Sequence, residues 1–322
     1  MSAKRTAGKG GARPSALYLV ATPLGNLEDV TARALRVLRE ATLVAAEDTR
    51  HTLKLLTHFG IKPRRLVSCF EHNEVRRTAP LLEELRSGGN VALVTDAGTP
   101  GVSDPGAVIV DAVLKEGFPV VPVPGPSAVV SALSVCGFRG TPFRFVGFLP
   151  SKPAERRTEL LRLRGEEAVL VFYESPHRVR DCLKDMMNVF GNRKGLVARE
   201  MTKVHEEFVR GSLQELWKAF KAREAVGEIT VVVEGAEHRE HSRSEDWAGV
   251  SIADQLTQFM KEHGLSKTEA VKAVCKLRDL PREVVYKIAT QLPAPDELEP
   301  RSHPSRQGFA EAGEDTKKEG TE

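Results

Sequence analysis

The segment at 96–106 has the residue types of a ligand-binding loop. It reads DAGTPGVSDPG and follows an apolar run at 91–95. Glycine lets a backbone come close to a ligand, and proline fixes the shape of a loop before anything binds. A connection that only joins a strand to a helix usually needs about 2–6 residues. The length and composition therefore favour a binding loop, with Asp96 and Asp104 as polar groups, at the strand end where open α/β sheets bind ligands.

Two shorter turns also follow apolar runs. Residues 21–29 (ATPLGNLED) contain one glycine, Gly25, so they match neither the G-x-G-x-x-G dinucleotide fingerprint nor the P-loop pattern. Taken alone, this segment is better explained as an ordinary strand-to-helix turn. At residues 122–128 (PVPGPSA), Ser127 could cap the following helix or offer its hydroxyl and N–H to a ligand. Ala128 is small enough to leave room for a flat ring.

Two charged segments carry candidate acids and bases. Residues 173–178 (YESPHR) end an apolar run, and residues 198–207 (AREMTKVHEE) follow another. Strand alternation predicts two faces for the second segment, one with Arg199, Met201 and Lys203 and the other with Glu200 and Thr202. A lysine or glutamate in a cleft could act as a general base or orient a hydroxyl. The alternative is the solvated face of a hairpin.

Nucleic-acid contact is weakly indicated in two places. Arg156, Arg157, Arg162 and Arg164 could contact phosphate, or could form a solvated helix face. Residues 250–292 show three short helical patterns, and Ser266 to Glu269 has the form of a capping box. This region fits a helix-turn-helix-like module that binds nucleic acid, or a small packing or dimerisation domain.

Apolar runs and amphipathic segments alternate along most of the chain. This alternation predicts an α/β protein with a mainly parallel first sheet and a mixed second sheet. We expect two α/β domains and a small C-terminal helical module. The expected division is a disordered basic tail at 1–16, α/β domains at 17–126 and 127–235, a linker at 236–249, the helical module at 250–292 and a disordered acidic tail at 293–322.

Composition excludes several classes of protein. The 322 residues include 47 Lys and Arg against 44 Asp and Glu, a net charge of +3, so the chain is neither a histone-like polycation nor an acidic solvating chain. The four cysteines are far apart and form no Cys/His cluster, so we expect free thiols and no metal site. No signal peptide or membrane-length apolar run is present, which predicts a cytoplasmic protein without membrane contact.

Seven segments together resemble the tetrapyrrole methylase superfamily of S-adenosylmethionine-dependent methyltransferases. They are ATPLGNLED at 21–29, AEDTRH at 46–51, DAGTPGVSDPG at 96–106, PGPSA at 124–128, FVGFLP at 145–150, YESPHR at 173–178 and AREMTKVHEE at 198–207. Members that act on corrinoid or porphyrinoid rings usually have a more glycine-rich first loop. The loop around Gly25 is similar to that of the ribosomal RNA branch instead. The resemblance implies two α/β domains with a cofactor cleft between them, usually in a homodimer.

The resemblance also implies roles for individual residues. S-adenosyl-L-methionine would be held by Asp96, Ala97, Gly98, Val102, Ser103, Ser127, Ala128, Met201 and Thr202. The last two would close over it from the second domain. Lys203 and Glu200 are the first candidates for catalysis, with Asp48, Arg50 and His72 as alternatives near strand ends of the first domain.

The implied activity is methylation of the ribose 2′-hydroxyl of cytidine 1402 in 16S rRNA, in the decoding centre of the small ribosomal subunit. A 2′-hydroxyl also distinguishes RNA from DNA, so no DNA partner is expected. Two alternatives stay open at this point. One is a methyltransferase that acts on a tetrapyrrole or another small molecule, and the other is a non-catalytic RNA-binding protein.

Overall fold

The first domain is a parallel sheet of five strands. The computed structural model describes residues 15–139, 142–237, 249–278 and 280–293. The strands are β1 (Leu17–Val20), β2 (Leu43–Ala46), β3 (Leu66–Ser68), β4 (Val91–Val94) and β5 (Val120–Val123), in the order β3-β2-β4-β1-β5. Every residue of β2 and β4 is buried. Burial on both faces is what a parallel strand covered by helices requires.

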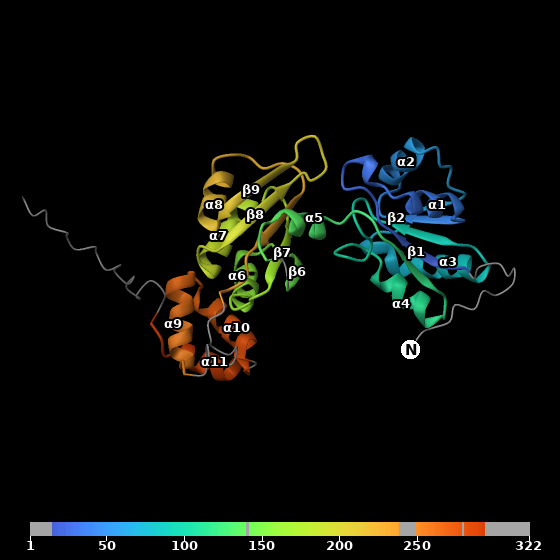
Figure 1. Ribbon diagram of the computed structural model, residues 1–322. Coiled ribbons are helices and arrows are strands. Elements are labelled where there is room, and N and C mark those ends of the chain that lie inside the picture. The colour runs from blue at the N-terminus through green and yellow to red at the C-terminus, as the bar shows by residue number, and fades with distance from the viewer. Residues whose placement is uncertain (1–14, 140–141, 238–248, 279, 294–322) are drawn as a thin grey trace, which may run out of the picture. The chain divides into compact units, whose positions relative to one another are not determined.

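Helices cover both faces of this sheet (Figure 1). Helices α1 (Ala32–Glu40) and α2 (Thr49–His58) pack on one face, and α3 (Glu74–Arg86) and α4 (Ala107–Lys115) pack on the other. Two short 3-10 turns, η1 (Leu27–Asp29) and η2 (Glu71–Asn73), precede α1 and α3. Because all five strands run the same way, the segments after β1, β2, β4 and β5 leave the sheet at one edge.

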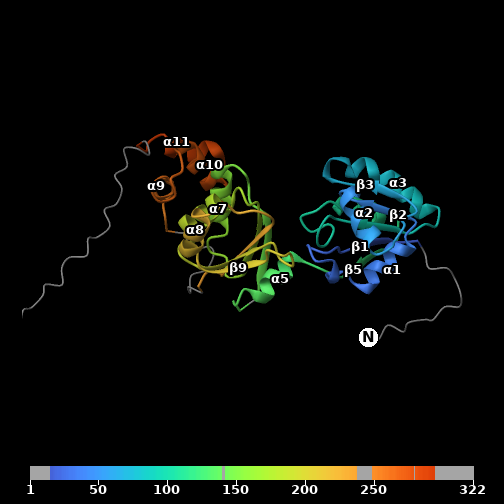
Figure 2. The same cartoon turned by 90° about the horizontal axis from the view of Figure 1, so that it is seen from above.

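The second domain contains a mixed sheet in the order β6-β7-β10-β8-β9. Its strands are β6 (Phe143–Phe148), β7 (Val169–Glu174), β8 (Lys194–Arg199), β9 (Glu207–Ser212) and β10 (Ile229–Val233). Only β6 and β7 are paired in parallel. Helix α5 (Ala128–Val135) covers one face, while α7 (Val179–Phe190) and α8 (Leu213–Lys221) lie on the other (Figure 2). Helix α6 (Pro153–Arg162) packs against α7. The predicted parallel and mixed sheets are thus confirmed.

A separate compact unit contains three helices, α9 (Ile252–His263), α10 (Lys267–Arg278) and α11 (Arg282–Ala289). Leu256, Phe259, Val274 and Val285 are buried where these helices meet. The predicted capping box is confirmed, because Ser266 and Glu269 exchange hydrogen bonds at the start of α10. Most of the predicted tails and of the predicted linker lies outside the described residues. The boundary of the first tail is wrong by two residues, because Ser15 and Ala16 form hydrogen bonds with Leu85 and Asn90. Within the described part of the chain, no helix is long and apolar enough to cross a membrane.

A buried carboxylate fixes the end of the predicted binding loop. Glu74, on α3, accepts hydrogen bonds from the backbone N–H groups of Gly106, Val108 and Ile109 at 2.9, 3.0 and 3.3 Å. These groups belong to the first turn of α4, whose N–H groups have no partners within the helix. A negative charge there is also favoured by the helix dipole. Glu74 therefore anchors α4 and, with it, the loop that leads into α4.

We expect Glu74→Gln to loosen the start of α4. The neutral amide keeps one acceptor oxygen but loses the charge-assisted bonds, so the free energy of local opening should fall by about 1–3 kcal/mol. Hydrogen–deuterium exchange of peptides that span α4 measures this change. Glu83→Gln is the matched control on the same helix, because the Glu83 side chain is 75% exposed. Equal exchange in both variants would contradict the anchoring role.

Candidate active site

A cavity of about 390 Å³ is lined by residues of both α/β domains. This volume is within the range of about 300–1,000 Å³ that is common for small-molecule sites. Eight of the nine residues predicted to bind the cofactor line the cavity: Asp96, Ala97, Gly98, Val102, Ser103, Ser127, Ala128 and Met201. The ninth, Thr202, is not among the lining residues. The resemblance thus named residues that are far apart in the chain and that lie around one cavity in the structure.

The loop after β4 is held by the turn after β1. Thr22 and Gly98 exchange two backbone hydrogen bonds, of 2.9 and 3.0 Å, and the Thr22 hydroxyl donates to the Thr95 carbonyl at 3.0 Å. The Thr99 hydroxyl donates to the Pro126 carbonyl at 3.3 Å, which connects the loop to the segment before α5. The segment at 21–29 is therefore more than an ordinary connection, because it fixes one wall of the cavity.

Ser127 stands at the N-cap position of α5, where one of the two interpretations of the sequence placed it. Its side chain makes no capping hydrogen bond to the helix. Both Ser127 and Ala128 line the cavity instead. The structure therefore favours the interpretation in which this serine faces a ligand.

A tight turn between β8 and β9 brings Met201 into the cavity. Ser103, Glu200 and Thr202 are the non-glycine residues with positive φ among those described, at 63°, 51° and 67°. Such backbone angles cost energy and often occur at functional sites. The expected strand alternation from Arg199 to Lys203 is wrong, because β8 ends at Arg199 and the chain turns back at once.

The same turn binds the turn after β1. The Thr202 hydroxyl accepts a hydrogen bond from the Asn26 N–H at 3.1 Å. The stem of Lys203 lies over Gly25, since a Cβ atom added to that glycine would stand 2.2 Å from Lys203 Cγ. A glycine is thus required at position 25, because the Lys203 side chain of the second domain lies too close to leave room for a Cβ atom. Thr202 and Lys203 lie at this contact and outside the cavity lining.

Lys203 is held by two carboxylates. Its Nζ lies 2.8 Å from Glu200 Oε1 and 3.2 Å from Glu228 Oε2. Burial alone would lower the pKa of Lys203, but the hydrogen bonds and charges of Glu200 and Glu228 outweigh it and raise the pKa. Burial would raise the pKa of Glu200, and its hydrogen bond from Lys203 outweighs this and lowers the pKa. An ammonium group has no lone pair to accept a proton, so this arrangement suits Lys203 for donating hydrogen bonds.

The alternative candidates in the first domain also lie outside the cavity lining. Asp48 caps α2 and pairs with Arg50, whose Nη2 lies 2.7 Å from Asp48 Oδ2. The hydrogen bond from Arg50 is the main reason why the pKa of Asp48 is well below its usual range. Asp48 is linked to the cavity because its N–H donates to Asp96 Oδ1 at 3.1 Å. His72 is exposed and has an edge contact with Phe70.

The cavity lining is acidic. It includes five carboxylates, and none of its residues is Lys, Arg or His. The five are Glu47, Asp96, Asp104, Glu174 and Glu228. A lining of this kind favours a cationic ligand and disfavours one with phosphates or several carboxylates. Of these acids, the sequence analysis gave Asp96 a cofactor-binding role, named Asp104 as a polar group of the same loop, and placed Glu174 in a segment with candidate acids and bases.

The remaining lining residues differ in how well the local sequence could have identified them. Tyr173 and Glu174 end β7 and lie in the segment at 173–178 that the sequence analysis singled out. Glu47 directly follows β2, so its position at a strand end could have identified it. Residues 227–230 also line the cavity, and 229–230 begin β10. Their sequence carries no comparable signal, because they reach the site only through the pairing of β10 with β7 and β8.

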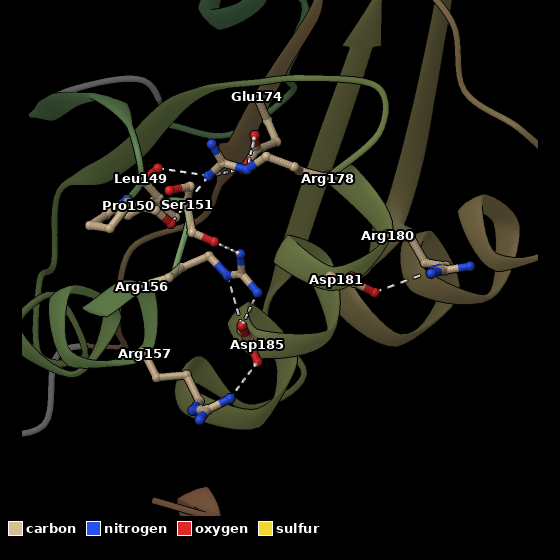
Figure 3. Close-up of polar contacts among 10 residues, drawn as sticks. All are labelled: Leu149, Pro150, Ser151, Arg156, Arg157, Glu174, Arg178, Arg180, Asp181 and Asp185. Carbon is tan, nitrogen blue, oxygen red and sulfur yellow. Dashed lines mark hydrogen bonds and ion pairs between the residues drawn. The ribbon is translucent and has the colours of Figure 1, made fainter. Parts of the chain in front are cut away.

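Arg156 fits neither of the two interpretations of the arginines after β6, which were phosphate contact and a solvated helix face (Figure 3). Arg156 is 4% exposed, and its Nη2 lies 2.6 Å from Asp185 Oδ2. Arg157 also approaches Asp185, at 3.8 Å, while Arg162 pairs with Glu159. Arg156 is therefore part of the packing between α6 and α7.

Two arginines hold the segment that follows Phe148. Phe148 itself lines the cavity. Arg178 donates from Nη2 to the carbonyls of Leu149 and Pro150 at 2.7 and 3.2 Å, and Arg156 points toward the Ser151 carbonyl at 3.4 Å (Figure 3). Arg178 is paired in turn with the buried Glu174 at 3.3 Å. The ion pairs therefore fix the backbone beside the cavity wall.

The chain belongs to the tetrapyrrole methylase family, because the profile of the family described as tetrapyrrole (corrin/porphyrin) methylases matches residues 16–217. The resemblance inferred from the seven segments is thereby confirmed. Two curated relatives share the name ribosomal RNA small subunit methyltransferase I. The protein of Halalkalibacterium halodurans is 44% identical over 279 residues, which cover 85% of this chain and 94% of that protein. The protein of Thermotoga maritima is 48% identical over 221 residues, which cover 69% of this chain and 99% of that protein.

A solved structure supports the fold. The crystal structure of the methyltransferase CobJ superposes with a TM-score of 0.54 at 22% identity, covering 71% of this chain and 97% of that one. At this identity the likeness concerns the fold alone. It agrees with the two α/β domains described above.

We expect the buried pair between Arg156 and Asp185 to be necessary for stability. Asp185→Ala leaves the Arg156 charge buried without its partner, so the free energy of unfolding should fall by about 3–5 kcal/mol. A double variant, Arg156→Met with Asp185→Leu, should recover most of the loss, because it removes both charges. Urea denaturation measures both. If Arg156→Met instead left stability unchanged and weakened RNA binding, the structural role would be wrong.

Proposed function

We propose that this protein is an S-adenosyl-L-methionine-dependent methyltransferase of small-subunit ribosomal RNA. The observation that carries the proposal is the 44% identity over 279 residues to a protein named for that activity. The site is the ribose 2′-hydroxyl of cytidine 1402 in 16S rRNA. The protein would act in the cytoplasm as a homodimer, as the family resemblance implies.

The cavity has the properties that this cofactor requires. S-adenosyl-L-methionine carries a sulfonium, an ammonium and a single carboxylate group, so its net charge is positive, and an acidic lining without basic side chains favours it. The small residues Gly98 and Ala128 leave space beside exposed backbone groups. The residues that would hold it are Asp96, Ala97, Gly98, Val102, Ser103, Ser127, Ala128 and Met201. When bound, the sulfonium supplies an electrophilic methyl carbon.

The protein's own contribution is positioning first and proton transfer second. A hydroxyl oxygen must approach the methyl carbon in line, and holding two reactants in this geometry accounts for much of a rate increase. The contact of Lys203 with Gly25 and of Thr202 with Asn26 keeps the turn at 200–206 against the first domain. These residues would thus position the wall that carries Met201.

The names of the relatives favour RNA over a tetrapyrrole substrate. The proteins that are 44% and 48% identical to this chain are both named for small-subunit ribosomal RNA.

Mapping of ribose methylation tests the proposed activity. In a strain without this gene, cytidine 1402 of 16S rRNA should lack its 2′-O-methyl group. Purified protein with S-adenosyl-L-methionine should restore the methyl group on small subunits from that strain, and heat-denatured protein is the control. If every ribose methyl remained in the deletion strain, the proposed function would be wrong.

Gly98→Trp tests the place of the cofactor. Gly98 lines the cavity with φ at +87°, so a tryptophan there is strained and fills the space. We expect calorimetry to show at least about a hundredfold loss of affinity for S-adenosylhomocysteine, roughly 2.7 kcal/mol. Gly117→Trp is the control, because Gly117 also has positive φ, at +77°, and does not line the cavity. Equal affinity in the two variants would place the cofactor elsewhere.

A further inference from the structure

We infer that the ring of Phe148 is the surface on which the base of the target nucleotide stacks, an inference that rests on the proposed methylation of RNA. Phe148 lines the cavity and is 58% exposed. By comparison, Leu24 and Met201 also line the cavity and are each 8% exposed. The ring therefore lies where the cavity meets solvent.

A β-bulge in β6 directs this ring. Strand β6 pairs in parallel with β7, and the register shifts between Phe145 and Gly147, which inserts an extra residue into β6. Successive residues of a strand point to opposite faces, so Phe145 and Phe148 would face opposite sides without the shift. With it, both rings contact the Tyr173 ring, at centroid distances of 4.9 and 5.6 Å. The bulge thus brings Phe148 to the same face as Tyr173.

The bulge depends on a glycine. Gly147 is buried and has φ at +75°, in the left-handed region that residues with a Cβ atom adopt only at an energetic cost. A Cβ atom there would also stand 3.1 Å from Ser103 Oγ, in the loop that lines the cavity. Gly147 therefore permits both the direction of Phe148 and the close approach of this loop.

The backbone that follows the ring is fixed as well. Arg178 donates from Nη2 to the carbonyls of Leu149 and Pro150, and its charge is paired with the buried Glu174 (Figure 3). A group whose position is fixed before binding loses little conformational entropy when a ligand contacts it. Phe148 is therefore a rigid aromatic surface, although it is exposed.

The contact with Tyr173 leaves a face of the Phe148 ring free. The planes of the two rings are inclined at 61°, which is an edge contact, so Tyr173 covers at most one face of Phe148. The free face is flat, apolar and uncharged, which suits a nucleobase and does not suit a phosphate. Stacking on an aromatic ring is available to every base, because every base has a π-face.

The chemistry of the substrate brings a base to this position. A base and its 2′-hydroxyl are attached to neighbouring carbons of one ribose, so a hydroxyl that reaches the methyl carbon inside the cavity carries its base to the opening. The residues at 96–98 and 127–128 that would hold the cofactor are buried or half-buried, which leaves the exposed ring to the nucleotide. Stacking on Phe148 keeps the base out of the RNA stack and the ribose in line.

Three substitutions of Phe148 test this role. In Phe148→Ala, kcat/KM for methyl transfer to small subunits that lack the modification should fall about 5- to 150-fold, as expected for the loss of one base–aromatic stack. Phe148→Leu keeps the apolar volume without a π-face and should lose nearly as much. Phe148→Trp restores the π-face and should stay within about threefold of the native value. A loss of packing alone would not show this dependence on aromaticity.

Phe143→Ala is the matched control. Phe143 also lies on β6 and is 47% exposed, and it is not among the lining residues, so this variant should keep the native kcat/KM. Calorimetry with S-adenosylhomocysteine distinguishes the base of the substrate from the adenine of the cofactor. The affinity of Phe148→Ala should stay within about threefold of the native value, and a loss of about tenfold or more would overturn the inference.

Photocrosslinking gives a readout that needs no methyl transfer. Phe148→p-benzoylphenylalanine, irradiated with the same small subunits, should crosslink to the target cytidine or its neighbours, and the same substitution at Phe143 should not. Reverse transcription locates the crosslink.

Three results would overturn the inference while the proposed function stands. They are a native kcat/KM in Phe148→Ala, a crosslink at a distant part of the RNA, and a changed oligomeric state of Phe148→Ala in sedimentation, which would make the ring an interface between copies. If the unaltered protein transfers no methyl group to small-subunit rRNA, the proposed function itself fails, and the inference fails with it.

Discussion

The site depends on hydrogen bonds that hold the loop at 95–106 in place. Many residues of this loop are partly exposed, so packing contributes little to its position. Thr22 fixes its first half through paired backbone bonds with Gly98, and Glu74 fixes its end at the first turn of α4. The turn around Asp104 lies between these two anchors. The lining of the cavity on the side of the first domain therefore follows from contacts made by β1 and α3.

The second constraint is the concentration of negative charge. Five carboxylates around one cavity repel one another, and the structure reduces this cost by pairing Glu174 with Arg178 and Glu228 with Lys203. The cations stand behind the carboxylates and outside the lining. What remains is a field suited to a positively charged cofactor. Burial raises the pKa of both Asp96 and Asp104, the two aspartates of the loop at 96–106.

Much of this architecture was predictable from local patterns. Alternating apolar runs and amphipathic segments predicted the sheets, because the periodicity reports which faces are buried. The length of the 96–106 loop and the small residues at 127–128 predicted a ligand-binding site, and these positions line the cavity. The buried pair between Arg156 and Asp185 was missed, since it joins two helices and leaves no local signal. The turn at Glu200 was missed because non-glycine residues rarely adopt positive φ.

The central claim is that this acidic cavity holds the cofactor against the loop at 96–106 and the start of α5. A crystal structure of the protein with S-adenosylhomocysteine tests it most directly. The account predicts that the ligand contacts residues 96–103 of the first domain and residues 127–128 and Met201 of the second domain. A ligand bound away from these residues would contradict the account.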